Sequence, residues 1–136
     1  MRNALVSILL LAATACGTTT RFIATNPSPR PLASRPAGSV AVFTTGHPDV
    51  PYVEVGIIQG RQSSTVSFDE MPGIIAAMRN DAGRAGCDAL IINGSSDKVV
   101  GDRHSTDTLE GFWGACVVYM NAPTSAVATA PGAAQP

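Results

Sequence analysis

The chain has 136 residues, with 9 basic and 10 acidic side chains and a formal net charge of −1. Hydrophobic residues make up 45% of it and aromatic residues only 5%. This length leaves room for a single small domain. The near-neutral balance and the few aromatic residues argue against a nucleic-acid-binding protein, which needs a basic surface with exposed aromatic side chains.

The start of the chain has the pattern of an export signal. A short cationic start, MRN, is followed by an apolar run from Ala4 to Ala13, and small residues, Ala13-Thr14-Ala15, precede Cys16. This order predicts a signal peptide over residues 1–15. The apolar run is too short for a transmembrane helix, which needs about 20 residues. A freely secreted protein and a retained anchor remain alternatives, since A-x-A also fits ordinary signal cleavage.

Cys16 directly follows these small residues, and this arrangement resembles the lipobox of bacterial lipoproteins. Ala13 stands where lipoboxes usually carry leucine. The resemblance implies that the Cys16 thiol is acylated and that Cys16 becomes the N-terminus. Gly17, in place of aspartate, favours sorting to the outer membrane by the same resemblance. Three acyl chains would anchor the protein firmly, whereas one chain alone binds only marginally. The membrane is therefore an expected partner.

Residues 16–38 are rich in proline and carry basic but no acidic side chains. Proline fixes φ and removes a hydrogen-bond donor, so we expect a disordered, basic, proline-rich tether. Its arginines either serve as ordinary solubilising charge or lie near anionic lipid or a partner surface, where each adds about 1 kcal/mol at most. The tail at residues 122–136 is uncharged and rich in Ala, Pro, Ser and Thr, and we expect it to be disordered as well. The prolines and arginines of the expected tether are Pro27, Pro29, Pro31, Pro36, Arg21, Arg30 and Arg35.

The expected domain, residues 39–121, begins with two strands. Val40–Phe43 is a short β-rich run that ends at a turn containing Gly46 and Pro48. Tyr52–Gln59 alternates apolar and other residues, which is the period of a half-buried strand. Within it, Gly56 indicates a bulge or a close approach of another segment.

A single helix is expected over residues 69–85. Asp69 is a suitable N-cap, Pro72 falls in the first turn, and Gly86 is suited to the C-cap. The apolar residues recur at helical spacing and form one stripe, which should pack on a sheet. The stripe consists of Met71, Ile74, Ile75, Met78, Ala82 and Ala85.

Two further strands complete the expected domain. The apolar run in Asp88–Gly94 is typical of a central strand covered on both faces. A polar loop at residues 95–107, with a short strand at Val99-Val100, leads to a last strand in Thr108–Met120. The resulting order, β-β-α-β-β, predicts a small two-layer α+β domain with one amphipathic helix on a small sheet.

Cys87 and Cys116 are expected to form a disulfide, because small exported domains use disulfides to compensate for thin cores. If the last two strands pair antiparallel with residue numbers that add up to 203, the two cysteines lie opposite each other. A bridge closing about 30 residues would contribute about 3–4 kcal/mol to stability. The alternative is two buried free thiols, since cysteine is often a small core residue.

Residues that could carry chemistry are few. Asp97, Asp102, His104 and Asp107 are the one cluster of ligand-type side chains, and together they could hold a divalent ion. Their spacing matches no calcium or zinc motif, so a solvated polar loop is the alternative. The turn at residues 93–96, NGSS, could bind an anion through its N–H groups or serve as a plain turn. We expect no cofactor and no catalytic residue, because no G-x-S-x-G elbow or other catalytic motif is found.

The stretches SVAVFTTGHPDVPYVEVGIIQ, GRAGCDALIINGSSD and ACVVY resemble a family of uncharacterised bacterial lipoproteins. More remotely, the plan resembles YbjQ-like domains and the Rcs envelope-stress sensor lipoprotein. The sensor is an outer-membrane lipoprotein with a proline-rich basic tether and a disulfide-stapled α/β domain. It has four domain cysteines, whereas this chain has two, so no contact residue of the sensor is transferred.

Together these features predict a non-enzymatic outer-membrane lipoprotein, lipidated at Cys16. It would present a small interaction or sensor-like domain to another component of the cell envelope. The alternative is a small ligand- or metal-binding envelope module that uses the polar loop at residues 95–107. The sequence does not identify the envelope partner.

Overall fold

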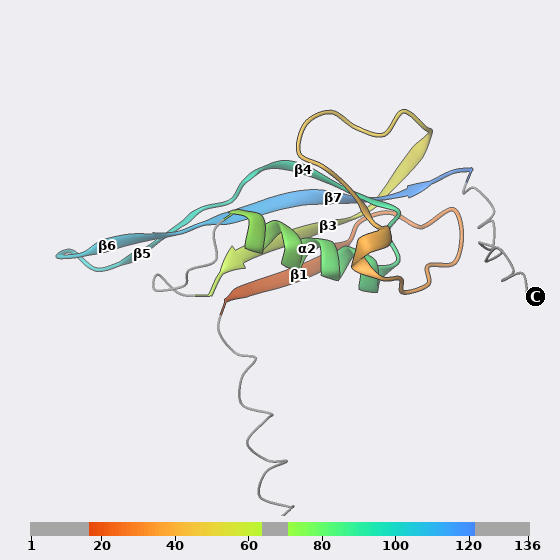
Figure 1. Cartoon of the computed structure of the whole chain (residues 1–136). Helices are drawn as coiled ribbons and strands as arrows, with labels where there is room; N and C mark the ends of the chain where they lie inside the picture. Colours follow the sequence, from red (N-terminus) through yellow and green to blue (C-terminus); the bar gives the residue numbers. More distant parts are fainter. Residues whose placement is uncertain (1–16, 64–70, 122–136) are drawn as a thin grey trace, which may run out of the picture.

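A computed structural model describes residues 17–63 and 71–121, and it is an α+β domain. A mixed sheet of five strands, in the order β1-β3-β7-β4-β2, carries one helix, α2, on one face (Figure 1). A separate two-stranded ribbon, β5–β6, extends from one end of the sheet. The predicted fold class is therefore confirmed. The elements are β1 (Thr18–Ala24), the 3-10 helix η2 (Ala37–Ser39), β2 (Ala41–Phe43), β3 (Tyr52–Gln62), α2 (Met71–Ala85), β4 (Ala89–Ser95), β5 (Lys98–Gly101), β6 (Thr106–Leu109) and β7 (Gly111–Tyr119).

The strand β1 corrects the prediction of a disordered tether. All seven of its residues pair antiparallel with β3, from Thr18 opposite Gln62 to Ala24 opposite Gly56. The sequence TTTRFIA is rich in β-branched residues and has an aromatic residue, which suits a pleated, half-buried strand. Phe22 packs against the core on the helix side. The prolines begin only after this strand, so the proline-based prediction was wrong for its residues.

Residues 25–36, which we call the strap, are also ordered and pack on the domain. The strap passes the C-terminal end of α2 on its way to η2 (Figure 1). The Arg35 N–H donates to the Gly83 carbonyl at 2.8 Å. A Cβ added at Gly83 would lie 2.6 Å from the Arg35 carbonyl oxygen, so the glycine permits this close approach. The prolines here fix an extended path against the helix and do not produce a free spacer.

The helix α2 packs its apolar stripe on the sheet, as predicted. Ile74, Met78 and Ala82 are fully buried, while Met71 at the start of the helix remains 50% exposed. Gly86 follows the helix with a φ of +85°, the left-handed conformation that a C-cap glycine supplies. The predicted N-cap, Asp69, lies outside the described residues.

The sheet has β7 at its centre, between β3 and β4, and β2 pairs with β4 in parallel. Leu90 of β4 joins the helix-side core, whereas Ala89 and Ile91 join a second apolar cluster on the opposite face. This explains the continuous apolar run of β4, since both faces of the strand are covered. The predicted irregularity at Gly56 is confirmed by a register shift between Glu54 and Gly56.

The predicted register between the last two strands was wrong. Leu90, not Cys87, lies opposite Cys116, so the paired residue numbers add up to 206 at this point. A further shift follows between Ile92 and Gly94. Cys87 precedes β4 and reaches Cys116 from beyond the end of the strand.

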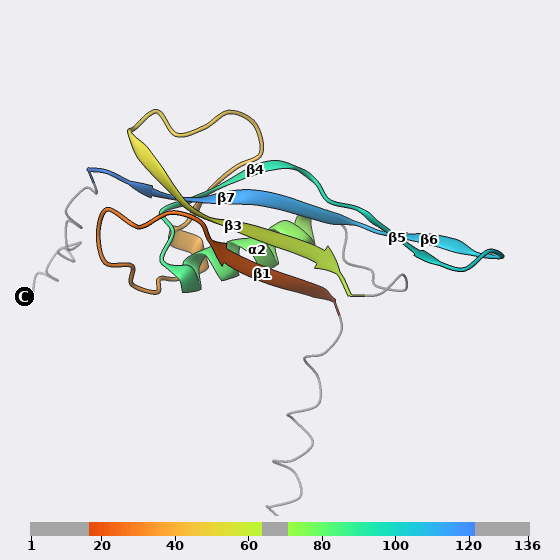
Figure 2. The same ribbon diagram turned by 180° about the vertical axis from the view of Figure 1, so that it is seen from behind.

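The polar segment at residues 95–107 contains most of the ribbon β5–β6, which the sequence prediction reduced to a short strand at Val99-Val100. Lys98 pairs with Leu109 and Gly101 with Thr106. Both views show the ribbon extending past the end of the sheet (Figure 2). Among the described residues, no helix has the length and apolar character needed to cross a membrane.

Candidate functional site

The disulfide between Cys87 and Cys116 is present and completely buried. Their Cα atoms are 5.5 Å apart, and both residues belong to the helix-side core with Met78 and Leu90. The predicted bridge is therefore confirmed, although its sequence argument used the wrong register. It fixes the segment before β4 to the central strand β7, beside the buried side chain of Asp88.

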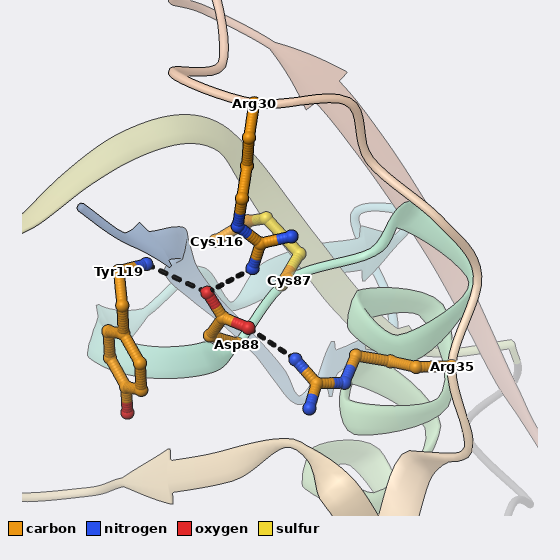
Figure 3. The surroundings of a disulfide bond; sticks show 6 residues. All are labelled: Arg30, Arg35, Cys87, Asp88, Cys116 and Tyr119. Carbon is orange, nitrogen blue, oxygen red and sulfur yellow. Dashed lines mark hydrogen bonds and ion pairs between the residues drawn. A yellow bond between two sulfur atoms is a disulfide. The ribbon is translucent and has the colours of Figure 1, made fainter. Parts of the chain in front are cut away.

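Asp88, next to Cys87, is the buried centre of a polar cluster at this end of the sheet (Figure 3). Arg30 Nη2 donates to Asp88 Oδ2 at 2.6 Å, and Arg35 Nη1 donates to Asp88 Oδ1. The backbone N–H of Tyr119 also donates to Oδ2, at 2.8 Å. The Asp88 side chain is only 8% exposed, and each arginine is 33% exposed. Two positive charges thus compensate one nearly buried negative charge.

The electrostatics of the cluster keep Asp88 ionised. Burial alone would raise its pKa, but the hydrogen bond from the Tyr119 N–H and the guanidinium groups of Arg30 and Arg35 outweigh burial and lower the pKa below its ordinary value of 3.8. The pKa of the Tyr119 phenol is raised, first by burial and then by the charge of Asp88. The carboxylate is therefore charged at neutral pH and attracts both arginines.

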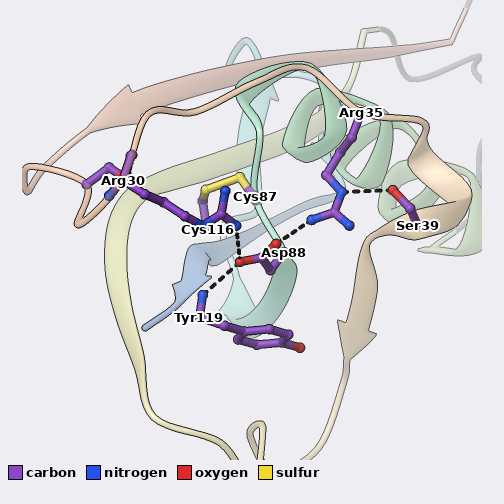
Figure 4. A network of polar contacts seen from close by, with 8 residues as sticks. Arg30, Arg35, Ser39, Cys87, Asp88, Cys116 and Tyr119 are labelled. Carbon is purple, nitrogen blue, oxygen red and sulfur yellow. Dashed lines mark hydrogen bonds and ion pairs between the residues drawn. A yellow bond between two sulfur atoms is a disulfide. The ribbon is translucent and has the colours of Figure 1, made fainter. Parts of the chain in front are cut away.

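The cluster fastens the strap to the domain (Figure 4). Arg35 Nε donates to Ser39 Oγ at 2.9 Å, and Ser39 Oγ donates to the Pro36 carbonyl at 2.7 Å. Arg35 thus joins the strap to η2 and to Asp88, which directly precedes β4. The sequence predicts Arg30 and Arg35 as solubilising charge or near anionic lipid or a partner surface, and this was wrong, because both form ion pairs with Asp88 within the domain.

The chemistry that this cluster permits is structural. Both oxygens of Asp88 are occupied by donors from the domain itself, which suits a fastening role better than proton transfer to a substrate. Sequence reasoning missed this role. The available signal was an aspartate between a cysteine and an apolar strand, since a buried aspartate requires cationic or N–H partners.

The four candidate metal ligands are spread along the ribbon and its base. Asp97 Oδ1 accepts the Gly111 N–H at 3.1 Å at the base of the ribbon. Asp102 Oδ1 accepts the N–H groups of His104 and Ser105 in the turn at the tip, and these bonds lower its pKa. Asp107 pairs with Val100. In the part of the chain that the structure describes, no three His, Cys, Asp or Glu side chains gather as a metal site. The structure therefore does not support the predicted alternative of a metal module.

Two surface hollows lie toward the end of the sheet from which the ribbon extends. The larger, of about 530 Å³, lies between the start of α2 and the base of the ribbon. The smaller, of about 230 Å³, lies on the edge pair β1–β3 and contains two arginines. The larger is lined by Met71, Pro72, Ser95, Asp97, Glu110 and Phe112, and the smaller by Thr19, Thr20, Arg21, Gln59, Gly60 and Arg61.

Comparisons with known proteins identify no family. No family model matches this chain, and no curated protein matches it. Among solved structures, the crystal structure of a Francisella virulence factor, FvfA, aligns with a TM-score of 0.47 and 9% sequence identity. The alignment covers 76% of this chain and 99% of that one. At this TM-score, the similarity carries no argument about function.

Proposed function

We propose that this chain is a non-enzymatic outer-membrane lipoprotein, acylated at Cys16, that presents a small interaction or sensor-like domain in the cell envelope. The observation that carries the proposal is the buried disulfide between Cys87 and Cys116. Stable disulfides of small domains are typical of oxidising compartments. The N-terminal pattern independently predicts export to such a compartment.

The fold changes one part of this proposal. Strand β1 begins at Thr18, so only Gly17 separates it from Cys16. Gly17 is also tied to the domain, because the Ser63 N–H donates to its carbonyl at 2.8 Å. An acylated Cys16 would therefore hold the domain directly at the membrane surface, without the flexible spacer that the proline content suggested.

This arrangement distinguishes the proposal from the model suggested by the Rcs sensor. A tethered sensor reaches a distant partner through its spacer, whereas a domain held at Gly17 meets partners within reach of the membrane surface. We therefore propose that the partner is another component of the same membrane or a protein seated on it.

Metabolic labelling with palmitate tests the anchor. We expect label in the wild-type protein and none in a Cys16→Ala variant, which would also leave the membrane fraction. A Cys87→Ala variant serves as a control, because loss of a core cysteine should leave the label in place. Absence of label in the wild-type protein would refute the anchor.

A further inference from the structure

The face of the sheet opposite α2 has a polar end and an apolar middle. Side chains alternate along β1, and Phe22 faces the helix, so Arg21 and Ile23 project from the opposite face. An apolar row crosses all five strands on this face, because each member lies opposite the next. The row consists of Ile23, Ile57, Ala115, Ile91 and Phe43.

The hollow of about 230 Å³ lies on the edge strand β1 and its neighbour β3. It is on the Gly17 side of the apolar row. Thr19 pairs with Arg61 and Arg21 pairs with Gln59, so the two arginines are diagonal neighbours across the strands. Residues that carry a hydroxyl, an amide and two guanidinium groups therefore line one hollow. All of these groups can donate hydrogen bonds to an anion.

The charges of this hollow are not neutralised by the domain. Arg61 Nη2 donates to the Ser96 carbonyl at 2.8 Å, and its Nε is buried without a hydrogen-bond partner. Within residues 17–63 and 71–121, no carboxylate forms an ion pair with Arg21 or Arg61. Arg30 and Arg35 differ in this respect, because Asp88 pairs with both. Arg21 and Arg61 therefore carry two positive charges that no described carboxylate neutralises, and a bound anion would supply the missing counter-charge.

The surroundings of the hollow suit an anion that carries an apolar portion. Trp113 pairs with Gln59 on the adjacent strand and is 36% exposed. Ile23 and Ile57, both half-buried, lie in the next row. Tryptophan has an apolar ring and a polar N–H, and it is enriched where proteins meet the interface of a membrane.

The position of the hollow along the chain points to the same ligand. Thr19 and Arg21 follow Cys16 by three and five residues. At about 3.3 Å per residue, they lie within about 10 Å and about 17 Å of it. We propose that Arg21 and Arg61, with Thr19 and Gln59, form a binding site for a phosphate group, supplied by the headgroup of an anionic lipid beside the Cys16 anchor. The lipid source rests on the proposed function, whereas phosphate binding itself does not.

The test uses the full-length chain with Cys16→Ser, so that no acyl chain carries it to a membrane. Vesicles of phosphatidylcholine, with and without phosphatidylglycerol, measure lipid binding, and calorimetry measures binding of inorganic phosphate. Binding to the neutral vesicles measures the contribution of the apolar run at residues 4–13, which does not depend on lipid charge. We expect stronger binding to the anionic vesicles, weakened about fivefold by Arg21→Gln, because one arginine near an anionic surface contributes that much. Added salt should weaken it further.

Arg84→Gln is the matched control, since it removes the same charge from an exposed position at the C-terminal end of α2. The affinity of this variant for anionic vesicles should stay within about twofold of that of the Cys16→Ser protein, because Arg84 lies outside the hollow. Arg61→Lys provides a second variant that keeps the charge but loses the planar fork, and its melting temperature shows whether the fold is retained.

The outcomes separate the possibilities. Loss of anionic-vesicle binding in Arg21→Gln but not in Arg84→Gln supports the lipid site. Phosphate binding that depends on Arg21, without any preference for anionic vesicles, supports the phosphate site and overturns the lipid source. Equal losses in both variants, or no binding of either ligand, overturn the site. If palmitate labelling fails while Arg21-dependent phosphate binding is found, the proposed function falls and the phosphate site stands.

Discussion

Asp88 is the side chain that fastens the proline-rich strap through two of its arginines. It lies at the end of the sheet, nearly buried, and receives Arg30 and Arg35 from the strap and the N–H of Tyr119 from β7. Removal of one partner from a buried ion pair leaves uncompensated groups, and this costs more than the pair contributes by itself. The stability of the domain should therefore depend on this one carboxylate more than on any exposed charge.

We predict that Asp88→Asn lowers the free energy of unfolding by about 3 kcal/mol at neutral pH, because it removes the charge that both arginines face. The wild-type protein should lose stability as the pH falls from about 5 toward about 2. The reason is that the pKa of Asp88 is lowered by folding, so the unfolded state takes up the proton first. Denaturant unfolding at several pH values measures both effects.

The same experiment on Asp49→Asn, an exposed position in the loop before β3, is the control and should leave the acid dependence nearly unchanged. If Asp88→Asn kept the full acid dependence of the wild-type protein, other carboxylates would be responsible and Asp88 would not be the fastening residue.

Gly83 provides a second test at the residue scale. In an exposed helix, glycine to alanine stabilises by up to about 1 kcal/mol. Here the added Cβ would lie 2.6 Å from the Arg35 carbonyl oxygen, a backbone atom, so we predict that Gly83→Ala destabilises by about 1–3 kcal/mol. Gly73→Ala, at an exposed position of the same helix, should have the opposite sign. Thermal melts of both variants decide the point, and a stabilised Gly83→Ala would show that the strap is not held against α2.

At the scale of elements, β2, β3, α2, β4 and β7 follow from local pattern, the ribbon β5–β6 was indicated only at Val99-Val100, and the order of the N-terminal segment was not predicted. Alternation in β3 and the apolar stripe of α2 are visible in the sequence because each element buries one face. Residues 25–36 are held by contacts with distant residues, among them Asp88, which lies more than fifty residues away, and no local pattern reports such contacts. The sequence TTTRFIA of β1 suits a strand, but the prolines that follow it favour an extended spacer and led to the wrong prediction for the whole segment.

The register of β4 and β7 was beyond sequence reasoning for a similar reason. One irregularity, at Ile92/Gly94, shifts the β4–β7 pairing by one residue, and a second, at Glu54/Gly56, shifts the β3–β7 pairing. Cys87 reaches Cys116 from the segment before β4. The constant sum of paired residue numbers holds only within paired strands, so it does not apply to this segment. The disulfide was correctly predicted because the argument from the oxidising compartment does not depend on register.

We predict that the double variant Cys87→Ala/Cys116→Ala loses about 3–4 kcal/mol of stability, since the bridge closes a separation of 29 residues. Combined with Asp88→Asn, the losses should not add, because Asp88 adjoins Cys87 and both changes loosen the start of β4. Denaturant unfolding of the double and triple variants measures the coupling. Strict additivity would show that the disulfide and the Asp88 cluster act independently.

At the scale of the whole molecule, the two ends of the sheet have different features. One end holds the disulfide and the Asp88 cluster. The other end carries the base of the ribbon β5–β6 (Figure 2). Gly17 and the hollow with Arg21 and Arg61 also lie at this end. In the proposed function, the second end adjoins the membrane, and the first end stiffens the domain away from it.

The mass of the native protein, extracted from membranes without reductant, tests this account most directly. We predict that the chain begins at Cys16, carries a mass increment equal to a lipid modification at that residue, and is lighter by two hydrogens because of the bridge between Cys87 and Cys116. A water-soluble protein with an unmodified N-terminus would contradict the account.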